Sequence, residues 1–458
     1  MKQTELYGFS QYKTPELKRL SKESVTFDRA YCQYPLCGPS RASLFLSKYP
    51  FSSSITWNQG GKSEAVQKKA IKNGLLTMPA YFKKHGYLTV GGGKLYHNTV
   101  LQDNSGSYDF STILNNKGKD GVKVKDGTDK KTNLTDASDY GIYEHRDGVL
   151  IKNAKVWIED YKQKEIKKPF LMCLGLKKPH SPFSAPKAFF KQYDPSKIEV
   201  SSIKAPDNII MKYSLNKLNS LFKGHADTMN YNSEAIPEKK QKEIIQAYSA
   251  CVSYVDYLIG DLIKTVKKNG LYNNTIIIFT SDHGYKLGEY NRWAKFTLHE
   301  KDTVVPFLIR VPNIKQSIGK KSKSLIGLID IFPTIAELCS LPKPQKIDGK
   351  SFVPVLHDTS KSSRQFIHTY IVRNVDSNEK ILGASIMSKA GYRYTQWWNK
   401  KDGFNPPESK LLAQELYDHY SDNNTAISLE NLYKSKPELL KQMYDYCNEI
   451  VIREWPKN

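Results

Sequence analysis

The feature that most constrains this fold is a set of short apolar runs separated by a long amphipathic segment. Residues 170–176, 275–280 and 304–309 are continuous or nearly continuous apolar stretches. Runs of this length are typical of strands whose two faces are both covered. Residues 241–268 repeat apolar side chains at helical spacing and stop before Gly270, which is a common helix terminator. The pattern predicts an α/β fold with a mostly parallel central sheet sandwiched by helices.

The sequence changes in character near residue 357. The segment 357–364, HDTSKSSR, is short and polar, as is typical of a linker. Alternating and aromatic residues follow at 392–398, and a last helix is predicted from about Pro437. We therefore predict a catalytic α/β domain over residues 1–356 and a smaller C-terminal α+β domain over residues 365–458.

Composition excludes several classes of protein. The net charge is +23, and only ten of the 69 basic residues are Arg. A basic surface attracts polyanions such as nucleic acid, acidic lipid or sulfated glycan, although a lysine-rich composition can also have no specific meaning. Nucleic-acid recognition relies on Arg forks, so we predict no nucleic-acid partner. The sequence contains no run of about 18 apolar residues, so no membrane-spanning helix is predicted. Its six Cys residues are widely scattered, which predicts neither a disulfide framework nor a zinc site.

The segment Cys37-Gly38-Pro39-Ser40-Arg41 is the most informative one. A Cys at the start of a helix can be a thiol nucleophile, because the helix N-terminus and Arg41 lower its pKa. The alternative is that Cys37 is a small buried residue ahead of a turn.

A second segment places Asp282 and His283 at the end of the strand predicted over 275–280. Sites in open α/β sheets lie beyond the carboxyl ends of the strands, so this pair is a candidate metal or catalytic cluster. The alternative is a turn in which Asp282 accepts a backbone hydrogen bond.

Four more side chains could join these two segments around a tetrahedral anion. Lys and His groups can balance the charge that develops on such an anion and on a leaving oxygen. The four candidates are Lys94, His97, His180 and Lys295.

Taken together, these segments resemble the type I sulfatases, which carry a C-x-P-S-R signature. The resemblance covers nearly the whole chain, with matching segments at 30–46, 93–97, 176–183, 279–289, 294–296, 348–352 and 415–418. The KPH at 178–180 and the DHG at 282–284 are similar to the branch that contains iduronate-2-sulfatase. The resemblance implies an alkaline-phosphatase-like fold and a sulfuric ester hydrolase that acts on a sulfated carbohydrate.

The resemblance also implies a role for each residue. Cys37 is expected to become formylglycine through a maturation enzyme that recognises Pro39 and Arg41, and Arg41 is expected to steady the hydrated aldehyde. The expected catalytic set is completed by Lys94 and Lys295 on the sulfate oxygens, His97 as a base, and His180 as a proton donor or sulfate ligand. One calcium ion is expected beside Cys37, Asp282 and His283.

One departure from the family pattern concerns the start of the chain. Sulfatases normally begin with a buried strand ending in Asp-Asp, whereas this sequence begins with residues similar to those that follow that pair. We expect the reading frame upstream of Met1 to encode an apolar strand of about five or six residues ending in Asp-Asp. We also expect the export signal of a periplasmic or secreted full-length protein there.

Two other functions stay open at this stage. A phosphonate or phosphodiester hydrolase of the same superfamily can also carry C-x-P-S-R. A non-catalytic binder of sulfated glycans would fit a strongly basic chain without the Asp pair.

Overall fold

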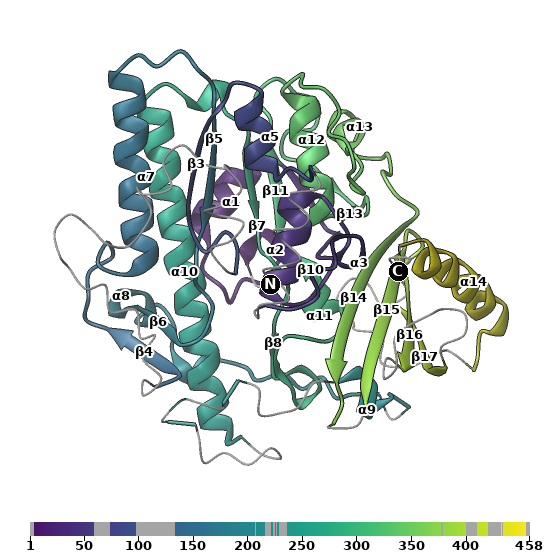
Figure 1. The fold of residues 1–458 in the computed structure, drawn as a ribbon. Coiled ribbons are helices and arrows are strands. Elements are labelled where there is room, and N and C mark those ends of the chain that lie inside the picture. The colour runs from purple at the N-terminus through teal and green to yellow at the C-terminus, as the bar shows by residue number, and fades with distance from the viewer. Residues whose placement is uncertain are drawn as a thin grey trace.

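A computed structural model describes residues 4–58, 74–97, 133–206, 208–215, 221–222, 225, 227–228, 236–376, 379–399, 410–419, 432 and 434–454. No helix in these ranges is long and apolar enough to cross a membrane. The central strands lie between two groups of helices, and a separate sheet carries the last helix on its outer side (Figure 1).

The central strands form three neighbouring sets rather than one continuous ladder. The first has the order β12-β1-β11-β7, the second is the pair β3-β5, and the third has the order β10-β2-β13. Their bounds are β1 (Val25–Phe27), β2 (Ala30–Tyr31), β3 (Leu88–Gly93), β5 (Phe170–Gly175), β7 (Ile277–Thr280), β10 (Val304–Val305), β11 (Phe307–Arg310), β12 (Lys321–Ser322) and β13 (Ile326–Gly327). The strands predicted over 170–176 and 275–280 are thus β5 and β7.

Strand direction is more mixed than the sequence predicts. β3 pairs in parallel with β5, and β1 with β12, but β11 runs antiparallel to both β1 and β7. The single strand predicted over 304–309 is divided at Pro306, which has no N–H for a ladder, into β10 and β11 in different sets. The apolar composition of residues 304–309 does not determine whether the strand is parallel or antiparallel, because helices bury both faces of either kind equally well.

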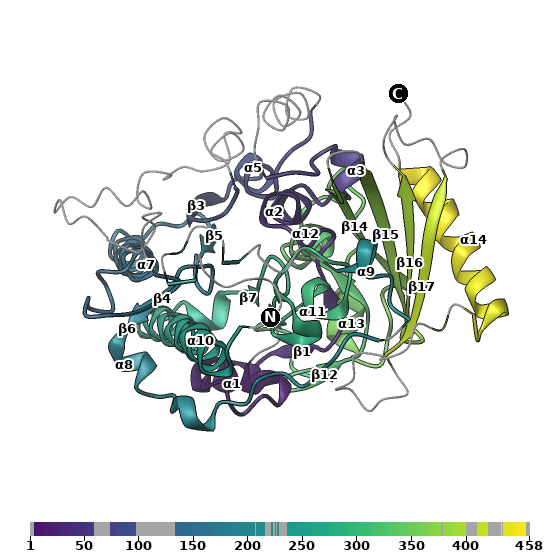
Figure 2. The same ribbon diagram turned by 90° about the horizontal axis from the view of Figure 1, so that it is seen from below.

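Helices cover the two faces of the central strands. Figure 2 shows α1 and α10 on one side and α2, α5 and α12 on the other. The helices are α1 (Pro15–Ser21), α2 (Cys37–Leu46), α5 (Met78–Lys84), α7 (Arg146–Gln163), α10 (Glu238–Lys268) and α12 (Ile331–Leu338). Leu17 and Leu20 of α1 pack on Leu308, while Phe45 of α2 and Phe82 of α5 join the core on the opposite face. The α/β class is confirmed.

The C-terminal part is an antiparallel sheet with a helix on it. Its four strands follow one another in sequence order, and helix α14 (Pro437–Glu454) packs on them (Figure 1). The strands are β14 (Phe366–Asn374), β15 (Lys380–Ser388), β16 (Tyr392–Asn399) and β17 (Leu411–Asp418). The outer edge of β14 meets the segment just before α2, where the Tyr370 N–H donates to the Gln33 carbonyl at 3.0 Å. The smaller α+β part predicted for this end is confirmed.

Candidate active site

The site is organised around Cys37, the first residue of α2. Leu36 ahead of it is extended, and the Cys37 side chain is buried. The next backbone N–H, that of Gly38, donates to Asn58 Oδ1 at 2.7 Å. A sulfur at this place lies at the positive end of the α2 dipole, which favours a thiolate. The alternative of an inert small residue is not supported, because polar groups surround the sulfur.

Three cationic or imidazole groups contact the Cys37 sulfur. Lys295 Nζ lies 3.1 Å from Sγ, and Lys94 Nζ and His283 Nε2 each lie 3.4 Å away. Burial alone raises the pKa of the Cys37 thiol. The charges of Lys295 and His283 and a hydrogen bond with His180 outweigh burial and the charge of Asp282, so the pKa of Cys37 is held well below its usual value. This site therefore stabilises negative charge at position 37.

The ring of His283 has a defined orientation. Its Nδ1 lies 2.8 Å from the Gly284 carbonyl, which can only accept, so Nδ1 carries a proton. The other nitrogen, Nε2, faces Cys37 and lies 3.6 Å from Asp282 Oδ1. His283 thus presents one nitrogen to the site and anchors the other.

His180 and His97 complete the ring of predicted residues. Burial lowers the pKa of His180 to about 4, the charges of Lys295 and Lys94 add to this, and a hydrogen bond to Cys37 opposes it. The pKa of His97 is lowered for the same kinds of reason, burial first. His97 Nδ1 is buried and makes no hydrogen bond within the described part of the chain. Both imidazoles are therefore neutral near pH 7.

Arg41 and Asp282 tie the segments together. Arg41 Nε donates to Asp282 Oδ2 at 2.8 Å, and its Nη1 donates to the Lys94 carbonyl. Ser40 donates to the backbone carbonyl of Asp282. Burial opposes ionisation of Asp282, but Arg41 and the neighbouring cations hold its pKa well below its usual value. Seven of the eight predicted residues line one cavity, although up to 258 positions separate two of them in the chain. The eighth, His97, lies close enough for the charges of Cys37, Lys94 and Lys295 to affect its pKa.

The donor atoms near Cys37 do not by themselves fit calcium. Cys37, Asp282 and His283 offer ligand atoms within 4.8 Å of one another. That set is one sulfur, one carboxylate and one imidazole, whereas calcium takes six to eight oxygen ligands. One Asp282 oxygen is also engaged by Arg41. The described residues therefore supply too few oxygens for the expected calcium ion.

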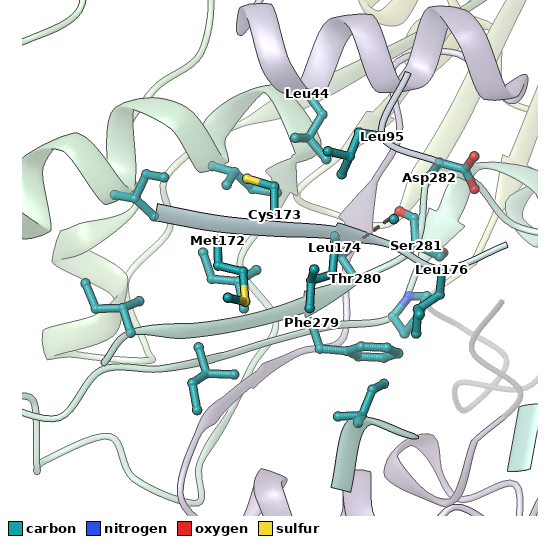
Figure 3. A pocket seen from close by; sticks show the side chains of 18 of the residues that line it. Leu44, Leu95, Met172, Cys173, Leu174, Leu176, Phe279, Thr280, Ser281 and Asp282 are labelled. Carbon is teal, nitrogen blue, oxygen red and sulfur yellow. Dashed lines mark hydrogen bonds between the residues drawn. The ribbon is translucent and has the colours of Figure 1, made fainter. Parts of the chain in front are cut away.

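A cavity of about 1350 Å³ extends from the site between β5 and β7. Figure 3 shows Met172, Cys173 and Leu174 of β5 with Phe279 of β7 around it, and Asp282 at one end. Within the described residues, β5 pairs only with β3, and β7 only with β11. The two edges that face the cavity therefore have no ladder partner in this part of the structure.

Some supporting residues were not predicted from the sequence. Asp302 is fully buried and accepts from Lys286, and its Oδ2 also accepts the Thr297 N–H at 2.8 Å. This network holds the loop that carries Lys295. Lys286 lies inside the matching segment 279–289, but nothing in the sequence indicates that Asp302 is its partner.

The mouth of the cavity holds an aromatic pair that the sequence also did not reveal. The side chain of Trp57 is 51% exposed, and its ring lies 5.8 Å from that of Phe296. Both residues line the same cavity as Cys37.

Comparison with known proteins defines the class of this fold and site. The sulfatase family model matches residues 2–341, and the model described as "N-sulphoglucosamine sulphohydrolase, C-terminal" matches residues 288–444. A sulfatase of Formosa agariphila is 32% identical, over 96% of this chain and 83% of that protein. Mouse iduronate 2-sulfatase is 27% identical over 90% of this chain and 85% of its own length.

Solved structures show the same fold. A phosphonate monoester hydrolase from Silicibacter pomeroyi superposes with a TM-score of 0.73 at 19% identity, covering 97% of this chain and 91% of that one. A protein solved with its substrate D-glucosamine-2-N,6-O-disulfate gives 0.70 at 20% identity, covering 99% and 95%.

The chain belongs to the sulfatase family of sulfuric ester hydrolases. The resemblance to sulfatases and to iduronate 2-sulfatase is thereby confirmed. Enzymes of this family generally use a formylglycine made from Cys and a bound metal ion.

Proposed function

We propose that this sulfatase removes sulfate from a sulfated carbohydrate at the ring of residues around Cys37. The observation that supports this most is the convergence of Lys94, Lys295 and two imidazoles on one buried sulfur with a lowered pKa. A group at this position that carries or attacks a sulfuryl group is surrounded by positive charge in a dry environment, where such charge stabilises a transition state most.

In the proposed mature enzyme, Cys37 is converted to formylglycine by a maturation enzyme, and its hydrated aldehyde supplies the nucleophilic hydroxyl. Lys94 and Lys295 bind sulfate oxygens, and Arg41 holds the Lys94 backbone and Asp282 in place. Splitting sulfate transfer into two covalent steps is the advantage of such a nucleophile.

His97 and His180 are proposed to move the protons. His97 is neutral at pH 7 and has a free ring nitrogen among the described residues, so it can accept a proton from the nucleophile. His180 has to be protonated to act on the leaving oxygen. A bound sulfate opposes the charges of Lys94 and Lys295, and it therefore raises the pKa of His180 when the substrate arrives.

A metal ion is proposed beside position 37, Asp282 and His283, where it would neutralise charge on a sulfate oxygen. An oxygen at position 37 in place of sulfur would improve the set for calcium, but it would still leave fewer oxygens than calcium prefers.

Three observations support a carbohydrate as the substrate. Exposed aromatic faces such as that of Trp57 can pack on the apolar face of a sugar ring. The mouse relative is named for iduronate, and the solved structure with 20% identity was bound to a sulfated glucosamine. A location outside the cytoplasm is part of this proposal, since sulfated polysaccharides are too large to enter freely.

The test is expression with and without a formylglycine-generating enzyme, followed by peptide mass spectrometry of position 37. Activity is then measured on 4-methylumbelliferyl sulfate, sulfated disaccharides, phenyl phosphonate and phenyl phosphate. We expect formylglycine, sulfate release and little phosphonate hydrolysis, with Cys37→Ala inactive. A dominant phosphonate activity would favour the alternative hydrolase, and sulfated-glycan binding without turnover would favour a binding protein.

A further inference from the structure

The segment 177–182, which carries His180, is held by a carboxylate outside the site. Asp147 lies in the first turn of α7 and is 3% exposed. Its Oδ1 accepts the Lys177 N–H at 2.8 Å, and its Oδ2 accepts the Lys178 N–H at 2.8 Å. Both oxygens are therefore used to fix consecutive backbone amides directly after β5.

Two hydrogen bonds within the segment 177–182 also hold its ends together. The His180 N–H donates to the Lys177 carbonyl at 2.9 Å, and Lys178 Nζ donates to the Pro182 carbonyl at 2.8 Å. Lys178 is almost fully buried. Burial raises the pKa of Asp147, and the two backbone N–H donors and the charge of Lys178 oppose this shift. The backbone on both sides of His180 is thus held by Asp147 and by the Lys178 side chain.

Asp147 itself has little freedom to move. A Cβ added to the next residue, Gly148, would lie 1.9 Å from the Ile142 carbonyl and 2.8 Å from the Tyr254 hydroxyl. That hydroxyl donates to the same carbonyl at 2.7 Å. The start of α7 therefore packs closely against the preceding turn and against α10, and this packing restricts the position of Asp147.

We propose that Asp147 is a positioning residue. It fixes the turn at 177–180 so that the His180 ring meets the reacting group at position 37. Asp147 does not contact that group, and it acts only through the backbone on either side of His180. The inference rests on the proposed role of His180 as the group that protonates the leaving oxygen.

The chain offers a matched control for this idea. Asp256 on α10 is 2% exposed and also accepts two backbone amides, those of Glu16 at 3.0 Å and Leu17 at 2.7 Å. It fixes the start of α1 rather than the site. The Asp256→Asn variant therefore measures how much stability and activity are lost with such a carboxylate when no catalytic residue depends on it.

The experiment is a double-mutant cycle in the mature enzyme with Asp147→Asn, His180→Ala and both together, beside Asp256→Asn. An Asn side chain keeps one acceptor but turns an NH₂ group toward the second amide. We expect D147N to lower kcat by ~10²-fold on an alkyl sulfate, with KM little changed, because a misplaced catalytic group costs about that much. The loss should shrink on 4-nitrophenyl sulfate, whose leaving group needs no proton.

The decisive result is the behaviour of D147N in the H180A background. We expect no further loss of kcat there, and we expect D256N to lower the melting temperature with kcat unchanged. Two results would overturn the positioning role of Asp147 and leave the proposed role of His180 intact. One is an equal loss of kcat from D147N with and without His180, and the other is a loss of kcat in D256N as large as that in D147N. Full activity of H180A would overturn the proposed role of His180, and the inference with it.

If D147N does not fold, Lys178→Gln tests the same turn from its other end. It removes the bond from Nζ to the Pro182 carbonyl and leaves Asp147 in place. The same coupling to His180 is expected, and its absence would contradict the proposal.

Discussion

The sheet at the C-terminus and the strands around the cavity contain similar apolar residues but bury them to different extents. In the C-terminal sheet, β15 and β16 are paired on both edges, and seven consecutive residues from Leu382 onward are buried. In β5 and β7, nearly every residue is only half-buried, although both strands lie deep in the molecule (Figure 1). The difference follows from the edges that face the cavity.

The C-terminal sheet contributes mainly to stability, whereas the strands around the cavity position the site. Complete ladders bury backbone and side chains together, and cores of that kind are packed closely. The site residues that line the cavity, in contrast, gather at its end, at the start of α2, in the segments that follow β3, β5 and β7, and at Lys295. We therefore expect core substitutions in the two regions to have different effects on stability.

The largest expected effect comes from the same truncation in both regions. Leu382→Ala removes a fully buried side chain between two paired strands and should cost about 2–5 kcal/mol of unfolding free energy. Leu174→Ala, in β5, should cost less than half as much, because its side chain already borders empty space. Urea denaturation measures both, and equal losses would mean that the cavity is closed in solution.

The next effect concerns activity. Lys295→Ala should lower kcat by ~10²–10³-fold, by analogy with the loss of one oxyanion donor, and leave the melting temperature nearly unchanged. Lys212, whose Nζ pairs with Glu379 on an exposed surface, is the control, and Lys212→Ala should leave kcat unchanged. Steady-state kinetics on an aryl sulfate decide this. A K295A enzyme with normal kcat would remove Lys295 from the site.

The sequence predicted the helices and strands well because they depend on local patterns. The apolar stripe of α10 and the strand β7 are both encoded within short windows. The site residues were predicted through separate motifs that the fold brings together. What they do individually stays a prediction.

Three features could not be predicted, and each depends on residues distant in sequence. The direction of β11 is set by its neighbours β1 and β7 rather than by its own composition. The clamp of Asp147 on the His180 turn joins a side-chain carboxylate to a backbone N–H 30 positions away. The cavity depends on which strands lie adjacent, and no window of sequence contains that information.

The third prediction concerns Cys→Leu substitutions, which should change stability by a smaller amount and in opposite directions in the two regions. Cys173→Leu on β5 directs extra carbon toward the cavity and should stabilise the protein by about 0.5–2 kcal/mol, as cavity filling commonly does. Cys447→Leu on α14 makes the same change in a filled core, where Cys447 is 1% exposed, and should destabilise by about 1–3 kcal/mol. Thermal melts of both variants test this, and a destabilised C173L would contradict the cavity.

The last effect is the dependence of stability on pH near the site. Burial lowers the pKa of His180 from 6.5 to about 4 in the folded protein. Between these two values the unfolded chain binds a proton at His180 that the folded chain does not, so stability should fall as pH decreases from about 6.5 to about 4. The contribution of His180 to this slope should be at most ~1.4 kcal/mol per pH unit. His180→Asn cannot titrate, so its unfolding free energy should decline less steeply over that window than that of the parent. Identical slopes in the two proteins would show that His180 is hydrated rather than enclosed. In that case the turn at 177–180 would lie open, and the site would share the looseness of the strands beside it.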